Sequence, residues 1–481
     1  MPYEPVIGLE IHIQLNTRSK VFCACPADSW GALPNTNICP VCAGLPGVLP
    51  VLNRAVVEKA VLLAAAVGCA EIAPESFFDR KNYFYPDLPK GYQITQYDEP
   101  IGRRGRFDLP MPDGSTRSVS IHKMHIEEDA GKTKTDPERG LRLIDMNRCG
   151  VPLVEMVTGP DLRSADEAAQ FLTRLRQLLR WLDVSEANME RAQVRCDANV
   201  SIREAGTSAL NSKTEIKNVN SIEAVREAIQ TEIERQVREV GAGRRVEAWT
   251  LEWDEDQQRL KKMRSKETEA DYRYFREPDL LSLLVDETWR DQILRGLPEL
   301  PIQRYVRFMD QYRLPAYDAA ILTDERSLSD YFEETVRQRG AGGDPKTLAN
   351  WVQNEILRVL KEQGSRAGEL ALTPAHLAEL SRLVDDKTIT RQTAVGLIPK
   401  IMATGQAPRD LVAAEGLAQI SGDDALRELV RQVIAENPNE VDAYKAKPSL
   451  LKWFVGQVMK KSRGKANAQA VEKILVERLG R

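Results

Sequence analysis

Strict alternation of apolar and polar residues near the start of the chain predicts a half-buried β-strand over residues 6–15. Apolar side chains occupy the odd positions from Ile7 to Leu15, and polar or small residues occupy the even ones. This period of two is typical of a strand with one face on a core. The other face presents Glu10 and His12 together, and a carboxylate beside an imidazole forms half of a metal site. A solvated strand face explains the pattern equally well.

A second alternating stretch, residues 193–203, carries Asp197 on its polar face, and a third places Lys213, Glu215 and Lys217 on one side. Carboxylates on separate strands of one curved sheet can converge on Mg²⁺, which takes oxygen ligands and clamps phosphates. Lysines on the same faces would neutralise phosphate oxygens, so we expect Lys213 and Lys217 to contact a nucleotide. The pattern fits phosphoryl transfer without a phosphate-binding loop, although solvated strand faces are the commoner explanation of such a pattern.

A strand-like run from residue 119 ends in three consecutive acids, Glu127, Glu128 and Asp129. Strand periodicity leaves Glu127 and Glu128 as alternative metal ligands, and a solvated acidic loop is the commoner explanation for such a cluster. The Gly131-Lys132-Thr133 that follows is no phosphate-binding loop. That motif needs a glycine five positions earlier, where Ile126 stands.

Residues 78–93 combine aromatic and basic side chains, Lys81 among them, with Pro86 and Pro89. The prolines argue against a regular helix or a central strand. An aromatic and basic loop suits stacking on a base and contact with phosphate, although an aromatic-packed structural loop is an equal alternative. Residues 263–279 form a second loop of this kind, with the same alternatives of nucleotide, RNA or another part of the chain.

Four of the seven cysteines form two tight pairs, Cys23 with Cys25 and Cys39 with Cys42. The chain shows no export signal, and paired cysteines in such a chain favour zinc over disulfides. Four protein ligands leave no open coordination position, so we expect a structural zinc site within residues 23–42.

Periodicity changes after a proline-rich stretch at 296–301, beyond which the chain is mostly helical. Expected helices there span 302–311, 327–338, 346–362, 374–384 and 389–403. Earlier, Ser164 and Ser221 each precede an amphipathic helix and are predicted to cap it. The cations of residues 452–465 form a basic patch near the end of the chain, which suits an RNA backbone as well as a solvated helix end.

The overall composition of the chain limits the kinds of function that it can have. The formal net charge is −4, so nucleic-acid binding must come from local patches rather than from the whole chain. No apolar run reaches 18 residues and no leader precedes the first strand, which predicts a cytoplasmic protein without a membrane partner.

Several unusual motifs, in order along nearly the whole chain, resemble the B subunits of the tRNA-dependent amidotransferases that act on glutamyl-tRNA(Gln) and aspartyl-tRNA(Asn). The matching runs are Val6-Ile7-Gly8-Leu9-Glu10-Ile11-His12, Arg80-Lys81-Asn82-Tyr83-Phe84-Tyr85-Pro86-Asp87, Glu127-Glu128-Asp129-Ala130-Gly131-Lys132, Gly150-Val151-Pro152-Leu153, Arg195-Cys196-Asp197-Ala198-Asn199-Val200-Ser201, Glu215-Ile216-Lys217-Asn218, Asp271-Tyr272-Arg273-Tyr274-Phe275 and Val455-Gly456-Gln457-Val458-Met459-Lys460.

The resemblance implies an α+β fold of three domains. Residues 1–295 would form a cradle domain similar to the glutamine synthetase catalytic domain, with a curved antiparallel sheet. Residues 296–408 would form an all-α domain, and residues 409–481 a small helical tail domain that binds tRNA.

The resemblance also implies a two-step reaction. ATP phosphorylates the side-chain carboxylate of misacylated Glu-tRNA(Gln) or Asp-tRNA(Asn), and ammonia then displaces the phosphate. The ammonia would come from an amidase, the A subunit of the same heterotrimer, which a small C subunit would hold to this chain. A non-discriminating aminoacyl-tRNA synthetase is a further expected partner.

Site residues carried over from the resemblance are the following. Lys81 would be a charged gate or phosphate contact, and Glu128 is favoured over Glu127. The magnesium ligands would be Glu10, His12, Glu128, Asp197 and Glu215, and the zinc ligands Cys23, Cys25, Cys39 and Cys42.

Two rival functions make different predictions. A glutamine-synthetase-like ligase acting on a small acid would not need the basic, helical C-terminal third. A non-catalytic tRNA-binding scaffold would need neither magnesium nor Glu10 and Asp197.

Overall fold

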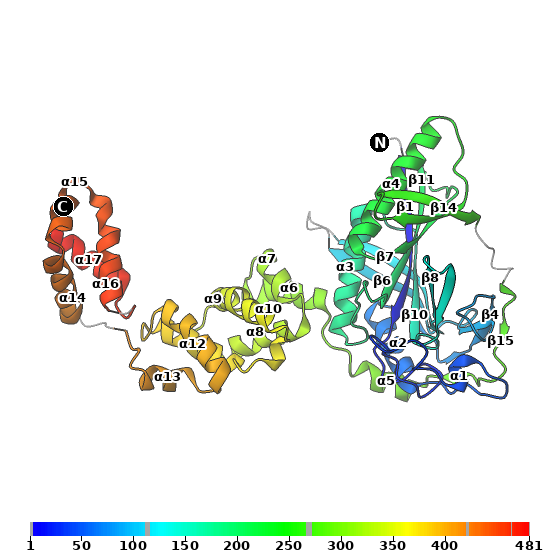
Figure 1. The fold of residues 1–481 in the computed structure, drawn as a ribbon, viewed down its shortest axis with the longest axis horizontal. Helices are drawn as coiled ribbons and strands as arrows, with labels where there is room; N and C mark the ends of the chain where they lie inside the picture. The colour runs from blue at the N-terminus through cyan, green and yellow to red at the C-terminus, as the bar shows by residue number, and fades with distance from the viewer. Residues whose placement is uncertain (1–2, 111–115, 266–271, 420–422, 463, 481) are drawn as a thin grey trace. The chain divides into compact units, whose positions relative to one another are not determined.

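A computed structural model describes residues 3–110, 116–265, 272–419, 423–462 and 464–480 (Figure 1). The chain divides into two compact units, residues 1–300 and residues 301–481. The described residues of the first unit share one hydrophobic core, and those of the second form two further apolar clusters. Each unit is therefore described by itself.

A large sheet dominates the first unit. At its centre β1 (Tyr3–Gln14) lies antiparallel between β10 (Pro152–Thr158) and β11 (Val194–Glu204), and β7 (Thr116–Glu128) borders β10. Beyond β11 and β7 the sheet continues through β12 (Thr214–Val219), β13 (Trp249–Asp254), β14 (Arg259–Ser265), β5 (Tyr92–Thr95), β4 (Asp79–Asn82), β15 (Phe275–Arg276), β6 (Gly102–Pro110) and β2 (Glu71–Ile72). The described ladders are antiparallel apart from the one joining β12 and β13.

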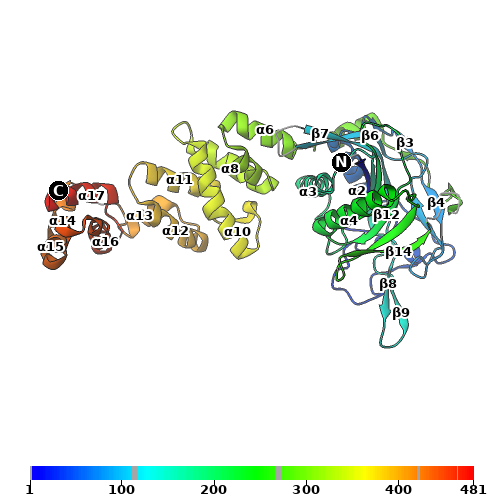
Figure 2. The ribbon, with the colours of Figure 1, turned by 90° about the horizontal axis from the view of Figure 1, so that it is seen from above.

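Three helices cover one face of this sheet, so its two faces differ in polarity. They are α2 (Arg54–Ala66), which packs on β6 and β7, and α3 (Ala165–Trp181) and α4 (Ile222–Gly241), which lie side by side (Figure 2). The odd-numbered residues of β1 are buried beneath them, from Ile7 to Ile13, whereas Glu10 and His12 point to the opposite face. The alternation predicted for this strand is confirmed.

Both predicted serine caps are present. Ser164 Oγ accepts a hydrogen bond from the Glu167 backbone N–H, and Ser221 Oγ accepts one from Ala224. Each satisfies a donor at the first turn that the helix itself leaves free. The apolar stripe of α3 is buried as its spacing predicts.

Residues 78–93 were predicted to form an aromatic and basic loop, but the structure differs. The strands β4 and β5 lie at the two ends of this segment and pair with each other. Pro86 and Pro89 fall in the connection between the strands, where neither interrupts a ladder. The stretch is therefore a hairpin with a proline-containing loop.

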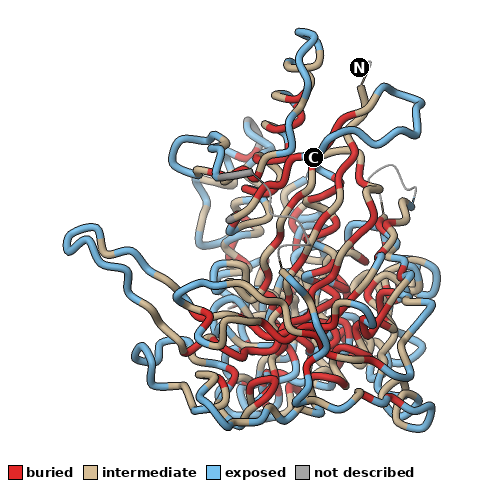
Figure 3. Tube along the Cα trace, turned by 90° about the vertical axis from the view of Figure 1, so that its right-hand side faces the viewer, coloured by how far each residue is buried: buried red, intermediate tan, exposed pale blue. Residues whose placement is uncertain are grey.

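Smaller elements complete the first unit: α1 (Pro40–Ala43), the pairs β3 (Glu75–Ser76) with β16 (Leu283–Leu284) and β8 (Lys132–Asp136) with β9 (Leu141–Asp145), and α5 (Glu287–Leu294). Buried segments follow the strands of the large sheet, whereas loops and hairpin tips are exposed (Figure 3).

The second unit is helical throughout its described part. Its helices are α6 (Pro301–Tyr312), α7 (Ala316–Leu322), α8 (Arg326–Arg339), α9 (Pro345–Trp351), α10 (Leu357–Gln363), α11 (Pro374–Asp385), α12 (Arg391–Thr404), α13 (Pro408–Ala414), α14 (Asp423–Glu436), α15 (Pro438–Ala446), α16 (Leu451–Lys461) and α17 (Ala468–Leu479). The helices expected between residues 302 and 403 are present, whereas α7 and the helices from α13 onward were not individually predicted. The single helix expected over 346–362 is divided by a π-helical turn at Val352–Ile356.

The mixed α and β composition with a large sheet is confirmed. The glutamine-synthetase-like cradle and the boundaries at 295 and 408 stay predictions. Within the described residues, no helix combines the length and the apolar character that crossing a membrane requires.

Candidate metal centre

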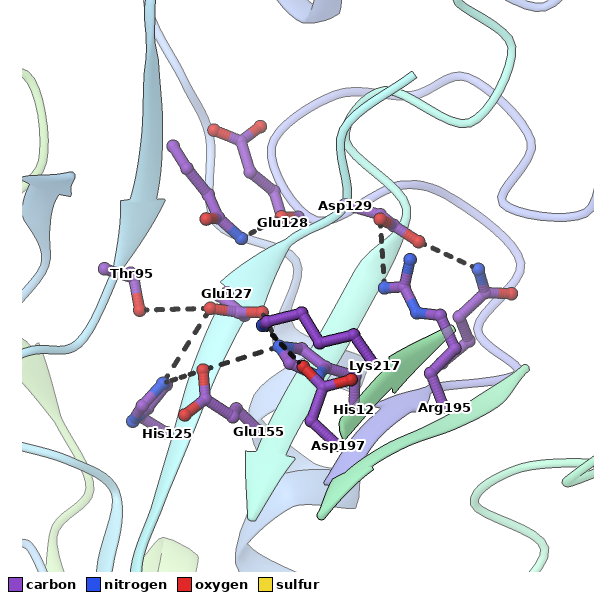
Figure 4. Close-up of polar contacts among 12 residues, drawn as sticks. His12, Thr95, His125, Glu127, Glu128, Asp129, Glu155, Arg195, Asp197 and Lys217 are labelled. Carbon is purple, nitrogen blue, oxygen red and sulfur yellow. Dashed lines mark hydrogen bonds and ion pairs between the residues drawn. The ribbon is translucent and has the colours of Figure 1, made fainter. Parts of the chain in front are cut away.

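Two imidazoles and two carboxylates meet on the polar face of the sheet, opposite the helices (Figure 4). His12 Nε2 lies 3.4 Å from Glu127 Oε1 and 3.5 Å from Glu155 Oε2. His125 Nε2 lies 3.0 Å from the same oxygen of Glu155 and 3.8 Å from Glu127 Oε2. Strand register explains the convergence, because His12 pairs with Glu155 across β1 and β10, and Glu155 pairs with His125 across β10 and β7.

The charged groups of this cluster shift one another's pKa values. Burial alone would raise the pKa of Glu155, but attraction to His125 and hydrogen bonds from both imidazoles hold it well below its ordinary value. Burial and the Glu155 charge raise the pKa of Glu127. Burial would lower the pKa of His12, yet the hydrogen bond to Glu155 and the charge of Glu127 raise it to about 9. Buried carboxylates at this spacing gain from a cation that neutralises them.

The donor set fits a divalent cation. The ligand atoms of Glu10, His12 and Glu155 lie within 4.8 Å of one another, as do those of His125, Glu127 and Glu155. Glu127 Oε1 and His125 Nδ1 are buried without a hydrogen-bond partner in the described structure. A buried acceptor without a donor is costly, so this oxygen is available to a metal ion.

A second acidic group adjoins the first. Lys217 Nζ donates to Asp197 Oδ2 at 2.8 Å and lies 3.6 Å from Glu215 Oε1. Glu10 pairs with Asp197 across β1 and β11, and burial, Glu155 and Asp197 together raise its pKa. The structure thus brings together Glu10, Asp197 and Glu215, which lie far apart in the sequence, with the Lys217 ammonium beside them.

Lys81 faces the first cluster. Its Nζ lies 4.8 Å from the centre of the Tyr272 ring, which together with Tyr83 forms an aromatic wall beside it. Burial would lower the pKa of Lys81, but the charges of Glu127 and Glu155 raise it. Lys213 is exposed and immediately precedes β12.

Glu128 lies apart from the predicted magnesium set. Its carboxylate bonds to the Lys90 ammonium and accepts from the Ile94 backbone N–H at 3.0 Å. Neighbouring residues of a strand point to opposite faces, so β7 directs Glu127 toward His12 and Glu128 away from it (Figure 4). Of the two alternatives that strand periodicity left open, Glu127 rather than Glu128, which the resemblance favoured, lies beside His12.

The four paired cysteines converge as their spacing predicts. Their Sγ atoms lie within 4.8 Å of one another, and those of Cys39 and Cys42 are 3.8 Å apart. A tetrahedron of sulfurs about 2.3 Å from a zinc ion has edges of roughly 3.8 Å, so the arrangement is close to that of a bound site.

Sequence reasoning missed Glu155 and His125. Glu155 is a lone acid inside the apolar run 153–157. A buried acid in a central strand needs a partner, so a lone acid within an apolar run was the feature of the sequence that could have identified Glu155 as a site residue. His125 shares a face with Glu127 at the spacing of two that identified Glu10 and His12.

Of the second aromatic loop, residues 266–271 lie outside the described part, whereas Tyr274 stacks on Tyr97.

Asp129, next to the cluster, holds a buried ion-pair network. Its carboxylate accepts from Arg195 Nη2 at 3.1 Å and from Gln14 Nε2 at 3.0 Å, and Arg148 Nε lies 3.6 Å away. Burial would raise the pKa of Asp129, but the two guanidiniums lower it. The network fixes the end of β7 that carries Glu127.

We expect Asp129→Asn to reduce the free energy of unfolding by about 1–3 kcal/mol at neutral pH, because two partly buried arginines lose their carboxylate. The pKa of Asp129 is lower in the folded chain than in the unfolded chain, where it is near 4. Its ionised carboxylate therefore stabilises the fold above about pH 4, and this stabilisation is lost as the pH falls through the folded-state pKa. The difference in the free energy of unfolding between the wild type and the variant should therefore shrink below about pH 4. Urea titrations at several pH values measure it, and a difference constant down to pH 2 would contradict this explanation.

Comparison with known proteins identifies the family. Residues 5–291 match the family model described as the GatB/GatE catalytic domain, and residues 330–479 match the one described as the GatB domain. A relative from Thermodesulfovibrio yellowstonii is 47% identical over 476 residues, which cover 99% of each chain. Relatives from Pelodictyon phaeoclathratiforme (47% over 480 residues, all of both chains) and Myxococcus xanthus (46% over 479 residues, 99% of each) are similar. All three are named as the B subunit of an aspartyl/glutamyl-tRNA(Asn/Gln) amidotransferase.

The chain belongs to this family of amidotransferase B subunits.

Membership in the amidotransferase B family confirms the resemblance that the motifs predicted. The word subunit in the relatives' names implies a complex of several chains. The matched catalytic-domain model spans the strands that carry both acidic clusters and the four paired cysteines.

Proposed function

We propose that this chain is the transamidating subunit of a glutamine-dependent tRNA amidotransferase. It would convert misacylated Glu-tRNA(Gln), Asp-tRNA(Asn) or both to the amidated form. The observation that carries the proposal is the convergence of His12, His125, Glu127 and Glu155 within the part of the chain that matches the GatB/GatE catalytic domain.

Chemistry explains why such a site is needed. A carboxylate is a poor electrophile, so an oxygen of the tRNA-bound side chain first attacks the γ-phosphorus of ATP and ADP leaves. The ammonia nitrogen then attacks the acyl carbon of this acyl phosphate, a proton leaves the nitrogen, and inorganic phosphate departs. Magnesium bound to the carboxylates would supply positive charge to the phosphate oxygens.

Each group of residues then has a role. Glu127 and Glu155, with His12, would hold one cation, and Glu10, Asp197 and Glu215 would hold a second one or position the nucleotide. Lys217 and Lys81 would neutralise phosphate oxygens, and Lys213 would contact the nucleotide if its segment moves inward. Cys23, Cys25, Cys39 and Cys42 would hold zinc.

The finer architecture belongs to the same proposal. Residues 1–295 would form the glutamine-synthetase-like cradle, 296–408 a helical domain, and 409–481 a tail that holds tRNA with the cations of α16. An amidase, the A subunit of the heterotrimer, would deliver ammonia, and a small C subunit would join the two chains. A non-discriminating synthetase would hand over the charged tRNA.

The deciding experiment incubates the complex with each misacylated tRNA, glutamine and ATP, and identifies the amino acid released from the tRNA afterwards. We expect glutamine from Glu-tRNA(Gln), asparagine from Asp-tRNA(Asn), or both. Recovery of only glutamate and aspartate would overturn the proposal, and amidation of free glutamate without tRNA would favour the small-acid ligase.

A further inference from the structure

Lys20 is a fully buried lysine in the wall of the cysteine cluster. Its side chain is 0% exposed, and its ammonium donates to the Asn37 carbonyl at 2.8 Å and to Cys42 Sγ at 3.6 Å. In the described part of the chain, no carboxylate forms an ion pair with it. The lysine is held in place by its own backbone, because its N–H donates to the Cys25 carbonyl at 2.9 Å and Asn53 Nδ2 donates to its carbonyl.

A buried ammonium needs a negative partner. Removing a lone positive charge from water costs several kcal/mol or more, and one neutral carbonyl compensates for only part of this. The only other acceptor at Lys20 Nζ among the described residues is the sulfur of Cys42, so the ammonium is compensated only if that sulfur carries negative charge.

A zinc ion held by four thiolates provides this charge. Its two positive charges leave the cluster with a net charge of −2, which is itself costly in a buried place. The Lys20 ammonium reduces the net charge to −1 and donates a charge-assisted hydrogen bond to one ligand. Cys42 is also the most buried of the four cysteines, so this bond lies where water contributes least.

We propose that Lys20 is the built-in counter-ion of a zinc-tetrathiolate site and determines how firmly this chain retains its zinc. The inference rests on the zinc site proposed above and extends it to a residue that coordinates no metal. Lys20 is a positioning residue, since it acts on the zinc through Cys42.

The test uses the purified full-length chain and two variants. Lys20→Met removes the charge and the donor at similar volume, whereas Lys20→Gln removes the charge but keeps a donor for the Asn37 carbonyl. Lys59→Met is the matched control, because Lys59 also donates to a backbone carbonyl, that of Asp183, and takes no part in the cysteine cluster. Zinc content is measured by mass spectrometry of the metal, and zinc release is followed with a chromophoric chelator.

We expect one zinc per wild-type chain and a transfer to the chelator that is about 10–100-fold faster in both Lys20 variants, the range for loss of a partner of a metal ligand. Lys59→Met should behave as the wild type does. Wild-type release rates in both Lys20 variants would overturn the inference, and so would a wild-type chain that holds no zinc while its thiols are reduced.

A measurement on the wild type keeps the inference testable if neither variant folds. Acetylation of Lys20 by acetic anhydride, read by peptide mass spectrometry, should rise several-fold once a chelator removes the zinc, whereas acetylation of Lys59 should not change. Equal acetylation of Lys20 in both states would overturn the inference. None of these readouts needs tRNA, so a chain that fails to amidate tRNA but releases zinc as expected would contradict only the proposed function.

Discussion

Glu127→Gln is expected to lower ATP-dependent phosphorylation of misacylated tRNA by about 10²–10³-fold, the range for loss of one preorganised group that stabilises transition-state charge. Glu127 Oε1 lies 3.4 Å from His12 Nε2 and has no hydrogen-bond partner among the described residues. The substitution keeps the size of the side chain and removes its negative charge. Transfer of labelled γ-phosphate to the charged tRNA measures the effect, and its magnesium dependence should move to higher concentrations.

The neighbouring residue provides the matched control. Glu128 is also a buried carboxylate on β7, but it bonds to Lys90 and to the Ile94 N–H rather than to the cluster. Glu128→Gln should lower the melting temperature, through a loss of about 1–3 kcal/mol, and leave the magnesium dependence unchanged. Loss of phosphorylation in Glu128→Gln with retention in Glu127→Gln would favour Glu128, the ligand that the resemblance implies.

Asp197→Ala should lower the same phosphorylation by about 10²–10³-fold while tRNA binding persists. Asp197 accepts from Lys217 at 2.8 Å and pairs with Glu10, so its removal leaves the Lys217 ammonium with the more distant Glu215. Without Asp197, the Lys217 ammonium is no longer held at the position where we propose that it contacts phosphate oxygens. Phosphate transfer and filter binding of the tRNA give the two readouts.

Asp254→Ala is the control for this second substitution. It removes another aspartate–lysine pair from the same sheet, the one between Asp254 on β13 and Lys261 on β14, and neither residue belongs to either acidic cluster. Its activity should stay within a few-fold of the wild type. Full ATP turnover by Asp197→Ala would contradict the assignment of the site and favour the scaffold function.

Local patterns predicted several strands and helices of the chain. The alternation around Glu10 and His12 and the serine caps of α3 and α4 depend only on near neighbours in the sequence, and the structure confirms them. The cysteine cluster was equally predictable, because two close pairs of thiols at this spacing are typical of a tetrahedral metal site.

Pairing between distant strands was not predictable in the same way. Glu155 joins His12 only because β10 lies beside β1, and nothing near residue 155 encodes that register. The choice between Glu127 and Glu128 depends on which face of β7 lies on the polar side of the sheet, and a shift of one residue in its register would exchange them. The π-helical turn at Val352–Ile356 interrupts a helix whose local sequence shows no breaker.

The position of β10 has a consequence for movement during turnover. It carries Glu155 and is hydrogen-bonded along both edges, to β1 and to β7, beneath a face covered by helices. Backbone amides in such an inner strand exchange with solvent only when a large part of the sheet opens. Glu155 therefore stands on a strand that resists local opening, and we expect any closure around ATP and the charged tRNA end to come from the loops rather than from this strand.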